Sequence, residues 1–162
     1  MTGKERLQAV LNHTNADKIA LDFGSTNVTG IHCRTMEALR RHYGLDDHPV
    51  YVYEPGQMLG LMENDLADAL GIDTIGAFAR DNAFGLPNVD WKEFRLPWGQ
   101  VVMLPAKLAD SIREENGTLY GYPTSLLRMR IDRWTRLAHG SSHFDLIPTA
   151  QLVEQHLALL TS

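Results

Sequence analysis

The sequence predicts an α/β protein with a parallel sheet. Strand patterns alternate with helical patterns over residues 1–76, two of the helical patterns stop at a glycine, and the strand patterns are short and largely apolar. Such alternation is typical of a parallel sheet covered by helices. Residues 90–123 break the alternation and have short antiparallel strand patterns instead.

The first predicted helix covers residues 3–13. Thr2 and Glu5 have the Thr-x-x-Glu spacing of a capping box, in which each side chain accepts a hydrogen bond from the other residue's backbone N–H. Apolar residues at helical spacing give this helix one apolar face. A polar turn at residues 12–17 follows, and residues 18–23 are predicted as a buried strand.

The second predicted helix begins at Ile31 or Thr35 and ends at Tyr43. Its apolar positions share one face, and Gly44 follows the last turn, where glycine is common. Residues 50–53 (VYVY) are β-branched and aromatic, so they are predicted as a short strand.

The third predicted helix covers residues 58–70, with methionines on an apolar stripe that we expect in the core. Residues 72–76 are the next predicted strand. Residues 115–117 (ENG) indicate a hairpin turn in the antiparallel region, because Asn-Gly accepts positive φ angles. The last predicted helix covers residues 149–160.

Composition and charge exclude several classes of protein. A chain of 162 residues suits one domain, and a net charge of −5 with dispersed basic residues argues against nucleic-acid binding. Cys33 is the only cysteine, so no disulfide can form within the chain, as in a reducing compartment. The sequence has no long apolar segment, which predicts a cytoplasmic protein with no membrane partner. One local basic group is predicted as a solvated helical face or a carboxylate site: Arg128, Arg130, Arg133 and Arg136.

Several segments, in their order and spacing, resemble the uroporphyrinogen decarboxylase-like family. Residues 1–13 (MTGKERLQAVLNH) resemble the family's "ERVLAALNH", and residues 16–25 (ADKIALDFGS) resemble "PDRVPLDFGG". The resemblance continues through residues 28–32 and returns at 57–60 and 70–76. These segments are closer to the branch related to corrinoid-dependent methyltransferases, because the arginine-rich "RQAGRY" loop of the heme-pathway decarboxylases is absent.

The resemblance implies a (β/α)8 TIM barrel. A closed barrel takes roughly 250 residues, so residues 1–162 would be its N-terminal half, a partial barrel with an antiparallel β excursion. Within it, residues 1–80 would hold the first helix and the βα units, residues 82–123 the excursion, and residues 124–162 a segment that departs from the family pattern.

The resemblance also implies a protein linked to tetrapyrroles or corrinoids. It would be a decarboxylase (a lyase acting on a porphyrin precursor) or a methyltransferase, incomplete and inactive alone. The alternative is a non-catalytic subunit or binding module that pairs with a separate C-terminal half, with a corrinoid protein or with a second copy.

Residues 19–26 (IALDFGST) carry the first candidate site. An apolar run leads to a carboxylate, Asp22, an aromatic ring, Phe23, and a flexible tip that begins at Gly24. In barrel and doubly wound folds, strand ends present side chains to a ligand. We therefore predict Asp22 as catalytic, as an acid or as a holder of a substrate N–H, and Phe23 and Gly24 as substrate-binding. The alternative is a buried strand that ends in a turn capped by Asp22.

Four further residues are predicted to bind substrate. Tyr53 and Gln57 lie at the C-terminal end of the second predicted strand, and Gln57 matches a residue of the family motif. His32 is predicted at the edge of the pocket. Asp73 lies inside a predicted strand, where a carboxylate is costly unless it has a function or is hydrogen-bonded.

No metal site is predicted. His32 and Cys33 are adjacent, and neighbours in a helix point about 100° apart, so they are poor co-ligands. His139 and His143 are four residues apart, but the residues between them form helices poorly. In the methyltransferase branch, zinc is held by cysteine and histidine of the C-terminal half. Zinc and corrinoid are therefore expectations for the full-length family, and this chain is predicted to hold no cofactor.

Overall fold

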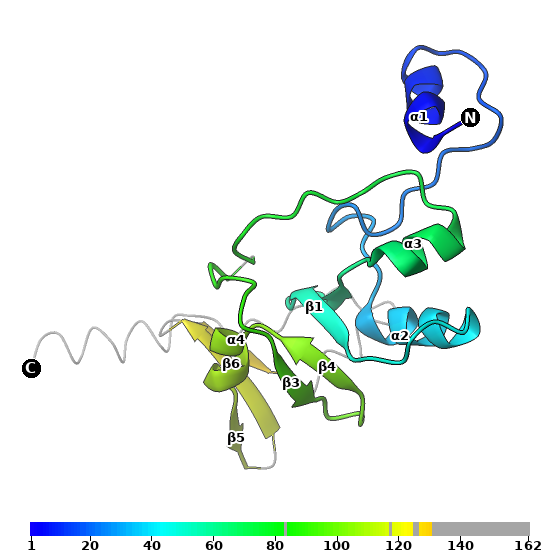
Figure 1. Cartoon of the computed structure of the whole chain (residues 1–162). Helices are drawn as coiled ribbons and strands as arrows, with labels where there is room; N and C mark the ends of the chain where they lie inside the picture. Colours follow the sequence, from blue (N-terminus) through cyan, green and yellow to red (C-terminus); the bar gives the residue numbers. More distant parts are fainter. Residues whose placement is uncertain (83, 117, 125–126, 131–162) are drawn as a thin grey trace, which may run out of the picture. The chain divides into compact units, whose positions relative to one another are not determined.

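The computed structural model describes residues 1–82, 84–116, 118–124 and 127–130 (Figure 1). The chain divides into two compact units, Met1–Arg80 and Asp81–Ser162. The predicted helix at residues 149–160 lies outside the described residues, as do His139 and His143. It stays a prediction that the chain is one part of a longer family domain.

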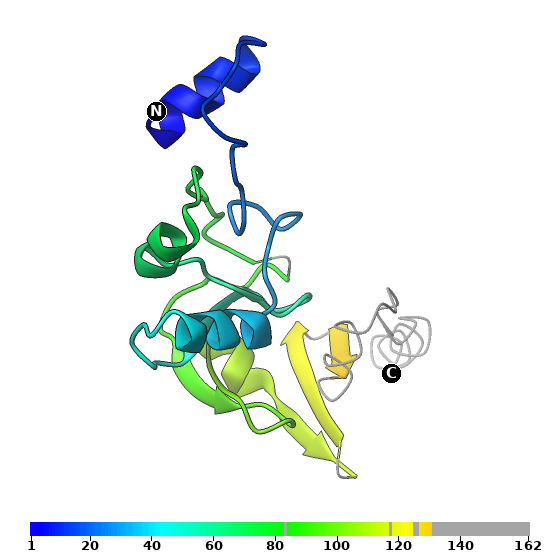
Figure 2. The same ribbon diagram turned by 90° about the vertical axis from the view of Figure 1, so that its right-hand side faces the viewer.

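The first unit begins with α1 (Gly3–Leu11), and the predicted capping box is confirmed. The Thr2 hydroxyl accepts from the Glu5 amide at 3.2 Å, and the Glu5 carboxylate accepts from the Thr2 amide at 2.8 Å. In both views α1 lies apart from α2 (Cys33–His42) and α3 (Asn64–Leu70) (Figures 1 and 2). The helix is therefore attached by a few specific contacts rather than by packing against other helices.

The core of the first unit forms between α2 and a hairpin of β1 (Val50–Glu54) and β2 (Leu59–Gly60). These strands are antiparallel, with Val52 opposite Gly60. α2 lies against β1, and burial of their apolar side chains stabilises the unit. The most fully buried apolar side chains of this core include Cys33, Met36, Val50, Val52, Met58 and Leu66.

The prediction of one helix over residues 58–70 is wrong in its first half. Met58 has a φ of 55°, Leu59 and Gly60 pair with β1, and only α3 is helical, ending at the C-cap Gly71. A Cβ on Gly60 would lie 2.4 Å from the Met36 sulfur, so glycine lets β2 approach α2. Strand pairing, which is not local in sequence, overrides the helical pattern here.

The predicted partial (β/α)8 barrel with parallel strands is also wrong. Residues 18–23 and 72–76 form no strand, and the strand pairs within each unit are antiparallel. The two segments do lie side by side, because the Asp73 amide donates to the Leu21 carbonyl at 2.9 Å. The Leu21 amide, however, donates to the Asp73 carboxylate at 3.0 Å instead of to a backbone carbonyl. A side chain thus ends the ladder after one backbone hydrogen bond.

The second unit contains antiparallel strands, as predicted for residues 90–123. β3 (Lys92–Arg95) pairs with β4 (Val101–Leu104), and β5 (Arg113–Glu115) pairs with β6 (Thr118–Thr124) around Asn116, whose φ is 51°. β7 (Leu127–Arg130) completes the sheet order β5-β6-β7, and a short helix that was not predicted, α4 (Ala106–Ser111), precedes β5.

Candidate functional site

A pocket of about 380 Å³ opens in the first unit. Its wall is built from residues 23–25, 61–64 and 74–76, together with Ala67 and Phe78. Most of these side chains are apolar or aromatic, and a few polar groups stand among them. Pockets of roughly 300–1,000 Å³ with such linings hold small organic ligands.

Asp22 does not line the pocket itself but accepts hydrogen bonds from two residues that do, Ser25 and Thr74. Its carboxylate accepts from the Ser25 hydroxyl at 2.7 Å, from the Ser25 amide at 3.3 Å and from the Thr74 hydroxyl at 2.8 Å. These hydrogen bonds, above all the one from the Ser25 hydroxyl, lower the pKa of Asp22. Asp22 thus joins two segments of the wall as an anion, and its catalytic role stays a prediction.

Phe23 and Gly24 belong to the wall itself, and their role in substrate binding stays a prediction. Phe23 is 46% exposed, so its ring is available at the pocket. Gly24 has a φ of 86°, and its amide donates to the Thr29 carbonyl at 2.8 Å. A Cβ at Gly24 would lie 2.9 Å from the Met62 Cβ. Glycine is therefore needed both for the turn and for the close approach of the two wall segments.

Tyr53 supports the wall through an aromatic pair. Its ring centroid lies 4.3 Å from that of Phe78, with the planes inclined at 44°, and Phe78 lines the pocket. The Tyr53 hydroxyl donates to the Thr26 carbonyl at 3.4 Å, and burial raises the pKa of Tyr53 to about 12. Tyr53 therefore positions Phe78 and stays protonated.

His32 and Gln57 lie away from the pocket wall. His32 is the N-cap of α2, where its Nδ1 accepts from the Arg34 amide at 3.2 Å, and burial lowers the pKa of His32. Gln57 is exposed in the turn between β1 and β2. The structure does not bring these two predicted residues to the wall that Phe23 and Gly24 form.

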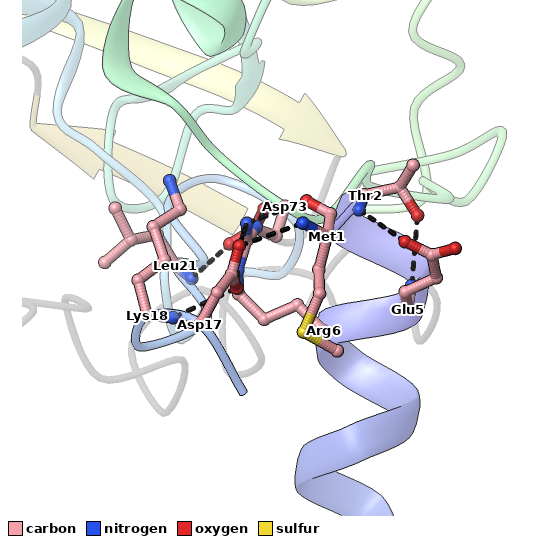
Figure 3. A network of polar contacts seen from close by, with 8 residues as sticks. All are labelled: Met1, Thr2, Glu5, Arg6, Asp17, Lys18, Leu21 and Asp73. Atoms are coloured by element: carbon pink, nitrogen blue, oxygen red, sulfur yellow. Dashed lines mark hydrogen bonds and ion pairs between the residues drawn. The ribbon is translucent and has the colours of Figure 1, made fainter. Parts of the chain in front are cut away.

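Asp73 belongs to a polar network that attaches α1 (Figure 3). The Arg6 guanidinium, 5% exposed, forms an ion pair with Asp73 and donates to Asp17 at 2.8 Å. Asp17 also accepts from the ammonium group of Met1 at 3.0 Å. These interactions lower the pKa of Asp17, and the hydrogen bond from Arg6 has the largest effect. In this structure Asp73 holds the helix in place.

Sequence reasoning missed Glu63, which lines the pocket beside the buried Arg40. The Arg40 guanidinium is 3% exposed and donates to Glu63 at 3.2 Å and to Asp65 at 3.0 and 2.8 Å. His48 lies 3.4 Å from the Glu63 carboxylate. Arg40 follows Met36 by four residues on the apolar face of α2, and a charge at such a position predicts carboxylate partners.

Among the described residues, no three or more His, Cys, Asp and Glu side chains are grouped so that they could hold a metal ion. In the same residues, no helix is long and apolar enough to cross a membrane. Burial raises the pKa of the Cys33 thiol to about 12. Comparisons of the chain with protein-family models, with curated proteins and with solved structures find no match.

Proposed function

We propose that the chain is a uroporphyrinogen decarboxylase-like protein whose pocket binds a flat tetrapyrrole-type ligand without turning it over alone. The observation that carries this proposal is the pocket of about 380 Å³ with the rings of Phe23 and Phe78 in its wall. Aromatic rings offer flat apolar surfaces on which a conjugated ligand can stack. The segment that resembles the family, residues 16–25, supplies part of that wall.

The absence of turnover follows from how the nearby carboxylates are engaged. A general acid must reach the reacting atom and have a pKa near the working pH. The Asp22 oxygens accept from Ser25 and Thr74, which keeps Asp22 ionised. Glu63 accepts from Arg40. We therefore expect binding but neither decarboxylation nor methyl transfer by this chain.

The test is a fluorescence titration of the full chain with protoporphyrin dimethyl ester, a flat tetrapyrrole whose carboxyl groups are esterified. We expect saturable binding that weakens at least tenfold in Phe78→Ala, because that ring is part of the wall. Phe94→Ala, on β3 of the second unit, is the matched control and should leave the affinity unchanged. No saturable binding, or equal losses in both variants, would overturn the proposal. Turnover of uroporphyrinogen, or of methylcobalamin with a thiol, would overturn its non-catalytic part.

A second candidate function is pairing, with a separate C-terminal half, a corrinoid protein or another copy. Large apolar side chains of the first unit are strongly exposed: Ile19 at 82%, Val28 at 94% and Ile75 at 88%. Exposed apolar surface favours association. Sedimentation velocity over a range of concentrations should show self-association that the variant Ile19→Ser, Val28→Ser, Ile75→Ser loses. A monomer at every concentration would exclude the second copy as the partner.

The proposal includes a cytoplasmic location and no metal or cofactor held by the chain itself. The lone thiol of Cys33 is 0% exposed, as a reducing compartment permits. Metal analysis of the purified, tag-free chain after dialysis tests the second part, and one equivalent of retained zinc would contradict it.

A further inference from the structure

We propose that the pocket selects flat ligands that carry neutral or cationic N–H donors and discriminates against carboxylates. This inference rests on the proposed function, since it assigns the ligand chemistry of the same pocket. It follows from the charge of the wall and from the direction in which its hydroxyl groups donate.

The ionisable charge of the wall is negative. Among the described lining residues, Glu63 carries the ionisable side chain, and the wall includes no lysine, arginine or histidine. The guanidinium of Arg40 lies behind Glu63, but it also donates two hydrogen bonds to Asp65. One arginine therefore faces two carboxylates there, and a ligand carboxylate would find no free cation in this wall.

A second carboxylate lies directly behind the wall. Asp22 bonds to Ser25 and Thr74, both of which line the pocket, and these hydrogen bonds favour its ionised form. The surrounding unit adds to the field, because residues 1–80 hold seven Lys and Arg against eleven Asp and Glu, a net charge of −4. Charges of one sign around a concave site repel ligands of the same sign.

The hydroxyl groups of the wall act as acceptors toward a ligand. A serine or threonine hydroxyl has one hydrogen and two lone pairs. Ser25 donates its hydrogen to Asp22 at 2.7 Å, and Thr74 donates its hydrogen to Asp22 at 2.8 Å. The Ser25 amide also donates to Asp22, and the Gly24 amide donates to Thr29. The lone pairs of these two hydroxyls remain as acceptors, which recognise N–H groups, and the exposed side-chain amide of Asn64 is a donor in the same wall.

The experiment uses three pyrene probes that share one ring and one four-carbon chain. They end in an ammonium, a hydroxyl or a carboxylate group, so they differ mainly in charge and in donor capacity. Affinities of the full chain are measured by fluorescence at pH 8, in low salt and in 1 M NaCl, and displacement by protoporphyrin dimethyl ester places each probe in the pocket. We expect the ammonium probe to bind about tenfold tighter than the carboxylate probe in low salt, and the ratio to fall to about twofold in 1 M NaCl.

Variants assign the effect to the pocket. Glu63→Gln keeps an acceptor for Arg40 and removes the charge, so it should reduce the ammonium-to-carboxylate ratio about threefold. Asp68→Asn removes one exposed charge from the same helix outside the wall and should leave the ratio unchanged. Equal or tighter binding of the carboxylate probe, with protoporphyrin dimethyl ester still bound, would overturn this inference alone. Failure to bind protoporphyrin dimethyl ester and every probe would overturn the proposed function as well.

Discussion

Replacing Gly24 with alanine tests how closely the loop packs against Met62. The φ of 86° at Gly24 costs an alanine about 1–2 kcal/mol. The new Cβ would lie 2.9 Å from the Met62 Cβ, an atom that cannot move without its backbone. Overpacking of this kind costs about 1–3 kcal/mol. We therefore expect Gly24→Ala to lower the free energy of unfolding by about 2–5 kcal/mol.

Gly44→Ala is the matched control for the backbone cost. Gly44 has a φ of 65°, and a Cβ there would meet no heavy atom within 4 Å. This variant should lose only about 1–2 kcal/mol. The difference between the two variants isolates the contact with Met62.

The assay is urea unfolding followed by circular dichroism, with hydrogen exchange of residues 22–29 as a local measure of the first unit. Met62→Gly should restore part of the stability when it is combined with Gly24→Ala, since it removes the Cβ that the new methyl group would meet. If Gly24→Ala were as stable as Gly44→Ala, the loop would not pack on Met62, and the argument for this pocket wall would fail with it.

Three further predictions concern the rest of the first unit. The pKa of Asp22 is lowered in the folded state, so its contribution to stability is complete above the ordinary carboxyl pKa of about 4 and is lost as the pH falls through the lower folded value. Asp22→Asn should therefore make the free energy of unfolding depend less on pH in that acid range. An unchanged pH dependence would contradict the cited hydrogen bonds. Arg6→Lys keeps the charge but loses the forked contacts with Asp17 and Asp73, so proteolysis at residues 12–17 should accelerate while binding of protoporphyrin dimethyl ester persists. Proteolytic resistance equal to that of the wild type would show that other contacts hold α1. Cys33 is 0% exposed with its pKa raised to about 12, so Ellman's reagent should react with it only after unfolding in urea; rapid reaction of the native protein would contradict this burial.

The parts of the fold that could be predicted from the sequence are those with local causes. The capping box at Thr2 and Glu5 starts α1, glycine follows α2, and the Asn-Gly turn at Asn116 joins two antiparallel strands. Each of these signals lies within a few residues of the structure that it specifies.

The parts that failed depend on partners distant in sequence. Asp73 accepts from an amide 52 residues away and so replaces a strand ladder with a side-chain contact. Met58 takes a positive φ because the residues after it pair with β1, although the pattern of residues 58–70 is helical. Neither partner is visible in a window of a single helix or strand.

The same distinction holds for the candidate site. Phe23 and Gly24 could be placed at a pocket because their segment has its own signal, an apolar run that ends in a flexible tip. Glu63 and Phe78 line the same pocket, but their segments carry no comparable pattern. Only the tertiary structure brings them beside Phe23.

The attachment of α1 through Arg6, Asp17 and Asp73 gives ionic strength a selective effect on this protein. Dissolved salt screens charge pairs, most strongly where one partner is as accessible as Asp17, at 41% side-chain exposure. Salts such as sulfate strengthen apolar burial at the same time. Titration with sulfate should therefore loosen the N-terminal helix while it tightens the hairpin core. Two parts of one unit can thus be shifted in opposite directions by a single solute, without any change to the sequence.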